Sequence, residues 1–292
     1  MDKLSNIGTI RDILNRHGFS FSKALGQNFL INPSVCPRMA ENAVQTQETG
    51  VIEIGPGIGV LTAELAKRAK KVSAIELDER LLPVLSETLS EFDNVTVINA
   101  DALKIDMRKL IEEHFADCKE VTVCANLPYY VTSPIIMKLL EDKLPIKSIT
   151  VMVQKEAAVR LCAEIGTREA GAITVGVRYY STPKMLFAVS RGSFMPAPNV
   201  DSAVISLSIA PRPAFEVGDE AVFFSLVKAA FSQRRKTLLN SLTATGFLSK
   251  EDVRRLLIES NIPLNARIEQ LTAEQLGTLS QAASGSKASG GE

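Results

Sequence analysis

The chain has 292 residues, 46% of them hydrophobic, which is enough for one large domain with an appendage or for two domains. Lys and Arg total 33 and Asp and Glu total 33, so the formal net charge is zero and any nucleic-acid-binding surface must be local. Four Cys without C-x-x-C spacing and only two His argue against a metal site and indicate reduced thiols. No apolar run approaches the ~20 residues of a membrane span, and the N-terminus lacks the apolar core of a signal peptide, so we expect a cytoplasmic protein.

The first half of the chain predicts a parallel sheet. A short helix is expected around Thr9–His17, ending at Gly18, and a loop follows from Lys23 to Leu30. Helical patterns later end at Ala69 and near Ser90. Apolar, β-branched segments recur as candidate strands at residues 51–54, 71–75, 95–99, 121–125 and 149–154. Strands that alternate with helices indicate βαβ crossovers, and therefore an α/β fold.

The next segment, Ala172–Tyr180, fits a strand or a helix by its pattern alone, and a doubly wound sheet favours the helix. Residues 185–189 and 203–209 then have the pattern of closing strands. Pro211-Arg-Pro213 ends this pattern, and the chain beyond it is helical. We therefore expect the sheet to be complete before residue 211.

Three helices are expected after the sheet. The first has an apolar face between Val222 and Phe231, the second is capped by Ser249 and ends at Glu259, and the third begins with the capping box Thr272–Gln275. We expect three regions: a sheet domain with an N-terminal extension over 1–210, a smaller all-helical domain over 211–283, and a disordered low-complexity tail over 284–292.

Gly or polar residues follow four successive predicted strands, where ligands of open α/β sheets bind. Gly55, Gly57 and Gly59 follow the first strand, and Glu76, Asp101 and Asn126 follow the next three. Glycines let a ligand approach the backbone closely. A carboxylate at the end of the second strand can accept both ribose hydroxyls, and Asp101 can accept a hydrogen bond from an adenine amino group. The sequence therefore predicts a nucleotide site at this edge.

The glycine loop favours S-adenosylmethionine over a dinucleotide. Dinucleotides call for G-x-G-x-x-G, with the pyrophosphate at the helix N-terminus, whereas this loop reads E-x-G-x-G-x-G from Glu53 to Gly59. S-adenosylmethionine has no phosphate, and the loop backbone can flank the carboxylate and ammonium of its amino-acid tail. A tight strand-to-helix turn is the alternative interpretation of the glycines alone.

Asn126-Leu127-Pro128-Tyr129 lies at the same edge, beside the expected methyl donor. The Asn126 side-chain oxygen and the Leu127 carbonyl can accept the two N–H bonds of an exocyclic amino group, and so stabilise the charge that develops on it. Pro128 stiffens the turn and Tyr129 can stack on a base. Phe194, on the Pro-rich loop Phe194–Pro198, can close the other side of that base. A turn with a packing Tyr, and a core Phe, are the structural alternatives.

Arg234, Arg235 and Lys236 form a basic run after the apolar face of the first C-terminal helix. Such runs are often solvated helix surfaces, but beside a base-modifying site this one is a candidate phosphate contact. Lys23 can add to the same RNA-binding surface.

Together these residues resemble the KsgA (RsmA) family of ribosomal RNA adenine dimethyltransferases over nearly the whole chain, from about Asn6 to Ala282. The matching stretches are Lys23–Leu30, Glu53–Gly59, Ala74–Asp78, Asn126–Tyr129, Met152–Glu156 and Phe194–Ala203. The resemblance implies a Rossmann-like S-adenosylmethionine-dependent methyltransferase with a C-terminal helical domain that helps to dock on the ribosome.

By the same resemblance, Asn28 and Leu30 join Gly55, Glu76, Asp101 and Asn126 as donor contacts, and no metal is needed. The implied substrate is a pair of adjacent adenines in the hairpin near the 3′ end of small-subunit ribosomal RNA, in a late, partly assembled particle. We expect a monomer that does not bind membranes. Many family members have Asn in place of Tyr130, Lys in place of Asn199 and Tyr-Gly in place of Ala170-Gly171. None of these differences removes a proposed catalytic group, but Tyr130 and Asn199 leave the local base and RNA contacts undetermined.

Three other functions are compatible with parts of this pattern. An Erm-like enzyme would modify an adenine of large-subunit RNA, but Leu25–Asn28 and Phe194–Ala203 favour the small-subunit family. An assembly factor would matter through binding more than through methylation, and both roles can coexist in one protein. A dinucleotide oxidoreductase is the remote alternative.

Overall fold

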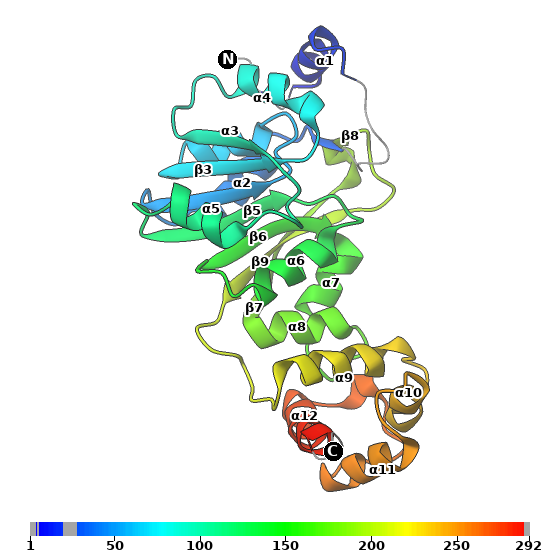
Figure 1. Ribbon diagram of the computed structural model, residues 1–292. Helices are drawn as coiled ribbons and strands as arrows, with labels where there is room; N and C mark the ends of the chain where they lie inside the picture. The colour runs from blue at the N-terminus through cyan, green and yellow to red at the C-terminus, as the bar shows by residue number, and fades with distance from the viewer. Residues whose placement is uncertain (1–3, 5, 20–27, 289–292) are drawn as a thin grey trace. The chain divides into compact units, whose positions relative to one another are not determined.

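The computed structural model describes residues 4, 6–19 and 28–288. Contacts divide the chain into two compact units, the first made of Met1–Ala158 and Pro183–Ile209 and the second of Val159–Thr182 and Ala210–Glu292 (Figure 1). This grouping differs from the expected boundary at residue 210 in one segment. Residues 159–182, which were expected in the sheet domain, group with the C-terminal helices.

The first unit is built on a seven-stranded sheet in the order β4-β3-β2-β5-β6-β9-β7. Its strands are β2 (Thr49–Ile54), β3 (Lys71–Glu76), β4 (Val95–Asn99), β5 (Glu120–Asn126), β6 (Ser148–Gln154), β7 (Ser181–Val189) and β9 (Ser202–Ile209). The strands from β4 to β6 are parallel, and β9 runs antiparallel to β6. Every residue of β2 is buried, as befits a central strand that is covered on both faces. The predicted α/β sheet is confirmed, and each expected strand lies inside an observed one.

Helices cover both faces of this sheet (Figure 1). The helices of the first unit are α1 (Ile7–Arg16), which packs beside α4, α2 (Val35–Ala43), α3 (Val60–Ala66), α4 (Leu82–Thr88), α5 (Met107–His114), α6 (Thr132–Glu141) and the start of α7 (Lys155–Cys162). Helix α1 begins before the expected Thr9 because the Asn6 side chain accepts hydrogen bonds from the first-turn amides and caps it. Helix α2 was not predicted.

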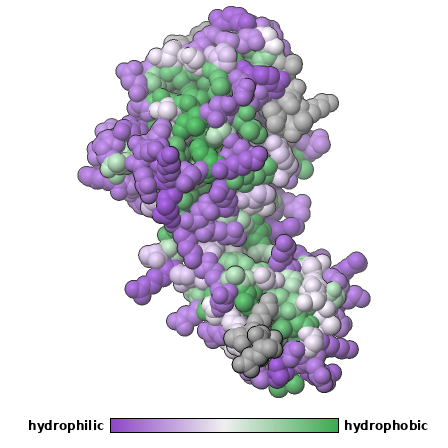
Figure 2. Space-filling model, in the orientation of Figure 1, coloured by the Kyte–Doolittle hydropathy of each residue, from purple (hydrophilic) through white to green (hydrophobic). Residues whose placement is uncertain are grey.

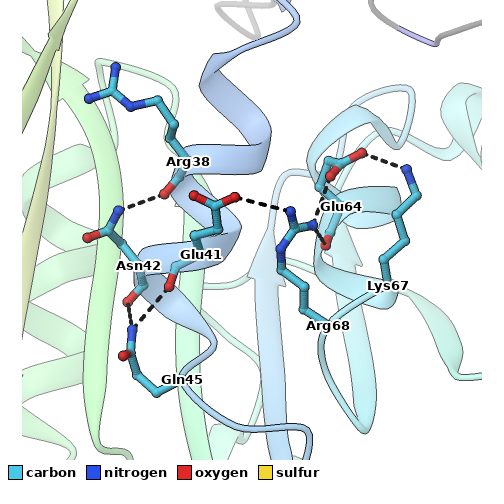
Figure 3. Close-up of polar contacts among 7 residues, drawn as sticks. All are labelled: Arg38, Glu41, Asn42, Gln45, Glu64, Lys67 and Arg68. Carbon is cyan, nitrogen blue, oxygen red and sulfur yellow. Dashed lines mark hydrogen bonds and ion pairs between the residues drawn. The ribbon is translucent and has the colours of Figure 1, made fainter.

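A polar network joins α2 to α3 (Figure 3). The Arg68 guanidinium donates to the Glu64 carboxylate at 2.8 Å and to the Glu41 carboxylate of α2 at 3.4 Å. Lys67 adds a bond to Glu64 at 2.6 Å. Lys67 and Glu41 are exposed, whereas Glu64 and Arg68 are half-buried. Ion pairs to exposed partners contribute little stability, so the network acts mainly as a local tie between the two helices.

The segment expected to be a loop up to Leu30 contains a short strand, β1 (Phe29–Leu30), which pairs antiparallel with β8 (Phe194–Met195). Phe29 lies opposite Met195, and Leu30 opposite Phe194. Beside this pair, the Ile31 amide donates to the Ser193 carbonyl at 2.8 Å. The pairing brings two distant parts of the sequence to the same end of the sheet.

The second unit contains α8 (Ala172–Tyr180), α9 (Glu220–Ser232), α10 (Leu238–Ala244), α11 (Lys250–Glu259) and α12 (Ala273–Ala288). Segment 172–180 is a helix, as the doubly wound arrangement favoured, and Ser249 and the Thr272–Gln275 capping box start α11 and α12 as predicted. Tyr179 packs edge-on against Phe224 of α9, with ring centroids 5.6 Å apart, which explains why α8 groups with these helices.

One expectation about the C-terminus is wrong. Residues 284–288, predicted to belong to a disordered tail, continue helix α12. The Ser284 hydroxyl donates to the Ser280 carbonyl at 2.9 Å and accepts from the Asp219 amide at 2.9 Å, so this turn is tied to the start of α9. Tertiary contacts thus hold a helix where small residues alone indicate disorder.

Candidate functional site

A cavity of about 160 Å³ lies in the first unit, at the carboxyl ends of β2, β3, β4 and β5. All predicted donor-contact and catalytic residues line it: Asn28, Leu30, Gly55, Gly57, Glu76, Asp101, Asn126, Leu127, Pro128, Tyr129 and Phe194. The structure therefore brings these residues together, and the role of each one stays a prediction. Figure 2 shows the hydrophobic surface of the first unit, in green, between hydrophilic borders.

The glycine loop forms one wall of the cavity. Gly55 and Gly57 have φ values of 72° and 61°, a conformation that strains any residue with a side chain. A Cβ at Gly55 would meet no atom within 4 Å, whereas one at Gly57 would lie 3.2 Å from the Phe29 ring. Gly55 therefore leaves open space beside the backbone, where a ligand can approach.

Glu76 ends β3 at the floor of the cavity. One carboxylate oxygen accepts from the Asp78 amide at 2.8 Å and the other from the Gly57 amide at 3.3 Å. Burial raises the pKa of Glu76, and these backbone donors oppose part of that rise. A carboxylate oxygen can accept more than one hydrogen bond, so both remain competent to bind hydroxyl groups.

Asp101 follows β4 and is half-buried. Its Oδ1 accepts from the Leu103 amide at 2.9 Å, and its Oδ2 lies 3.6 Å from the Lys104 ammonium. The first of these bonds fixes the turn after the strand and so orients the carboxylate at the cavity wall.

Glu53, which the sequence analysis did not assign to the site, is its most unusual group. It lines the cavity from the end of β2, is 1% exposed, and its Oε2 has no hydrogen-bond partner among the described residues. Burial, together with the charge of Glu76, raises the pKa of Glu53 to about 8. The Thr62 hydroxyl lies close enough to oppose part of this rise, but within the described structure no hydrogen bond of ordinary geometry joins the two groups.

A carboxyl group that is buried without a partner points to a missing cationic or donor group. The signal was present in the sequence as a single acidic residue inside an otherwise apolar strand.

The turn after β5 presents two hydrogen-bond acceptors. Among the described residues, none donates to the Asn126 side-chain oxygen or to the Leu127 carbonyl. The backbone of the turn is nevertheless held, because the Leu127 amide donates to the Met152 carbonyl at 3.3 Å and the Pro128 carbonyl accepts from the Val131 amide at 3.2 Å. Two acceptors on a fixed turn suit an amino group with two N–H bonds.

The two predicted aromatic contacts differ in their surroundings. Tyr129 is half-buried, and its hydroxyl is hydrogen-bonded to Ser202 Oγ of β9 at 2.8 Å; burial raises its pKa. Phe194 is 4% exposed and belongs to a hydrophobic core cluster, although it also lines the cavity. Phe194 is therefore a core residue whose contact with a base stays a prediction.

The predicted RNA-binding run lies in the second unit, in the turn between α9 and α10. Arg234 donates to the Arg168 carbonyl at 2.8 Å, and its guanidinium carbon lies 5.8 Å from the centre of the Phe231 ring. Arg235 and Lys236 are exposed. Lys23 lies outside the described residues, and the RNA-binding role of all these residues stays a prediction.

Among the described residues, the structure contains no group of three or more His, Cys, Asp or Glu that could hold a metal ion. In the same part of the chain, the helices are too short or too polar to cross a membrane.

Known proteins resemble this chain over most of its length. The family model described as ribosomal RNA adenine dimethylase matches residues 18–284. The ribosomal RNA small subunit methyltransferase A of Bacillus licheniformis is 53% identical over 273 residues, which are 92% of this chain and 94% of that protein.

Two solved structures have the same fold. A dimethyladenosine transferase from Plasmodium falciparum aligns with a TM-score of 0.67 and 25% identity, over 86% of this chain and 95% of that one. The 23S rRNA methyltransferase ErmE aligns with a TM-score of 0.63 and 28% identity, over 88% of this chain and 100% of its own.

Proposed function

The chain belongs to the ribosomal RNA adenine dimethylase family, and on that premise we propose that it dimethylates the exocyclic amino groups of two adjacent adenines. The proposed target is the hairpin near the 3′ end of small-subunit ribosomal RNA, in an immature particle late in assembly. The proposed enzyme is a cytoplasmic monomer with S-adenosylmethionine as its methyl donor. One observation carries this proposal: a single cavity is lined at three strand ends by residues suited to the methyl donor, and at the fourth by two acceptors to which no described residue donates.

The residues of the cavity fit S-adenosylmethionine. Gly55 leaves room for a ligand beside the backbone, and the two oxygens of Glu76 suit a pair of ribose hydroxyls. Asp101 suits the adenine amino group. The buried Glu53, whose Oε2 has no hydrogen-bond partner among the described residues, suits the ammonium of the amino-acid tail. When bound, this donor supplies a methyl group on a positively charged sulfur.

The acceptor side of the site would work by positioning and by electrostatics. The adenine amino nitrogen forms a bond to the methyl carbon as the carbon–sulfur bond breaks, and positive charge develops on the nitrogen until a proton leaves to solvent. The Asn126 side-chain oxygen and the Leu127 carbonyl stabilise that charge through the two N–H bonds. Tyr129, held by Ser202, limits the movement of the base.

The comparisons favour the small subunit over the large one as the substrate. The relative named for the small subunit is 53% identical to the chain, whereas the 23S enzyme is 28% identical. An assembly role that depends on binding can coexist with catalysis. A variant without methyl transfer that still restores small-subunit assembly would show that the two roles are separable.

The direct test is mass spectrometry of ribosomal RNA from a strain that lacks this gene. We expect dimethyladenosine to disappear from two adjacent positions near the 3′ end of the small-subunit RNA, and to return with the wild-type gene. Unchanged small-subunit RNA, or a loss in large-subunit RNA instead, would contradict the proposed substrate.

A further inference from the structure

Tyr130 extends from the cavity rim into solvent. It lines the cavity, yet it is 57% exposed, and the other large apolar side chains exposed to a similar extent in the described structure are all aliphatic. No hydrogen bond or ring contact joins its side chain to another described residue. A single exposed aromatic residue is ordinary on a protein surface; its position at the rim of this cavity gives it a specific use.

The sheet order assigns Tyr130 to one half of the cavity. In the order β4-β3-β2-β5, Asp101, Glu76 and Gly55 follow the first three strands, and Asn126 ends the fourth. The proposed donor therefore occupies the half at β4, β3 and β2, and the target base occupies the half at β5. Tyr130 comes four residues after the end of β5 and lines the cavity, so it borders the half where the RNA strand must enter.

Two consecutive tyrosines have different surroundings on this turn. Tyr129 is half-buried and tied to Ser202, whereas the Tyr130 ring is free to meet a ligand. The turn beneath them is fixed, because the Pro128 carbonyl accepts from both the Val131 amide and the Thr132 hydroxyl at 3.2 Å. The geometry thus presents one aromatic ring at the target base and a second at the rim.

We propose that Tyr130 stacks on the base next to the target adenine, so that the site holds two successive bases of a single strand. This inference rests on the proposed function, which places a flipped adenine at Asn126. Unpaired bases stack on aromatic rings with little dependence on sequence. The two proposed target adenines are adjacent, so each is the neighbour of the other. A ring at a fixed place in the site stacks on the neighbour at one side of the target. Tyr130 is therefore a positioning residue.

The experiment uses full-length protein and immature small subunits that lack the methyl groups. Base stacking on one ring predicts that Tyr130→Ala weakens particle binding about tenfold, which is ~1.4 kcal/mol. Tyr130→Phe keeps the ring and should bind like wild type, and donor affinity should be unchanged in both variants. Met185→Ala, a change at another exposed apolar side chain of the first unit, is the matched control and should behave as wild type.

The most specific measurement is a double-mutant cycle, in which a substitution in the protein is combined with a base replacement in the RNA. Two particles are prepared, each with one of the adjacent adenines replaced by uridine, which stacks less strongly, and single-turnover methylation of the remaining adenine is measured. In at least one particle, the replacement should slow the wild-type enzyme and leave Tyr130→Ala unaffected. Equal effects of both replacements in the two proteins would overturn the inference, as would a Tyr130→Phe variant as weak as Tyr130→Ala. If wild-type protein methylates no adenine in unmodified particles, the proposed function itself fails, and that outcome is distinct from either of these.

Discussion

Replacing Glu53 by Gln should stabilise the empty protein at alkaline pH. In the folded protein the pKa of Glu53 is raised from its ordinary value of 4.5 to about 8, chiefly by burial. The folded state therefore binds one more proton than the unfolded state between these two values, and its stability falls as the pH rises through this range. Below pH 4.5 the carboxyl group is neutral in both states, so the loss of stability that comes from burying its charge is absent.

The size of the effect follows from the same pKa values. A rise from 4.5 to about 8 corresponds to ~5 kcal/mol, at 1.36 kcal/mol for each pH unit. Because water in the adjoining cavity can hydrate part of the charge, we expect ~2–5 kcal/mol in practice. Gln has nearly the same shape as the protonated acid and no charge, so the variant lacks the penalty.

Urea denaturation of the donor-free proteins at pH 5 and pH 9 measures this difference. Between pH 5 and pH 9, the free energy of unfolding of the wild type should fall by ~2–5 kcal/mol relative to that of Glu53→Gln. The variant should therefore be the more stable protein at pH 9. If the free energies of unfolding of the two proteins changed with pH in the same way, Glu53 would be ionised and well solvated in the folded state. The same variant should bind S-adenosylmethionine more weakly at pH 9, because the negative charge proposed to face the ammonium is gone.

Three variants test the other roles. Glu76→Ala should weaken S-adenosylmethionine binding tenfold or more, ~1.4 kcal/mol, in calorimetry; unchanged affinity would remove the ribose assignment. Asn126→Ala should keep particle binding but slow single-turnover methyl transfer by ~10²–10³, and a rate close to wild type would take Asn126 out of the chemistry. Neutralising Arg234, Arg235 and Lys236 together should weaken binding to immature small subunits and flatten its salt dependence, while donor affinity stays the same; normal binding at several salt concentrations would show a solvated surface.

The parallel strands were predictable because each one is a local pattern. An apolar, β-branched segment followed by a polar residue identifies a strand and its carboxyl end, and this pattern alone predicts Glu76, Asp101 and Asn126 at one edge. Their convergence needs only the rule that parallel strands end on the same side. Element ends were less accurate, as with α1, whose start depends on the Asn6 cap.

The parts that were missed depend on contacts between distant residues. Strand β1 has two residues, and two residues carry no periodicity; it exists because Leu30 pairs with Phe194. The last turn of α12 has a low-complexity sequence and is held by the bond between Ser284 and the Asp219 amide. The grouping of α8 with the C-terminal helices likewise rests on the packing of Tyr179 against α9.

Glu53 and Glu76 show why strand-end residues alone do not define the site. Both are carboxylates near the carboxyl ends of neighbouring strands, but the sequence analysis assigned only Glu76 to the site. In the fold, the backbone amides of Gly57 and Asp78 donate hydrogen bonds to Glu76. Glu53 instead lies beside Cys36 of α2, a helix that was not predicted, and burial with the charge of Glu53 raises the pKa of that thiol. The missed helix therefore explains the missed residue: α2 packs against β5 and β6 and lines the cavity beside Glu53, so it helps to bury this carboxyl group, whose Oε2 has no hydrogen-bond partner among the described residues. A bound cation would stabilise its ionised form.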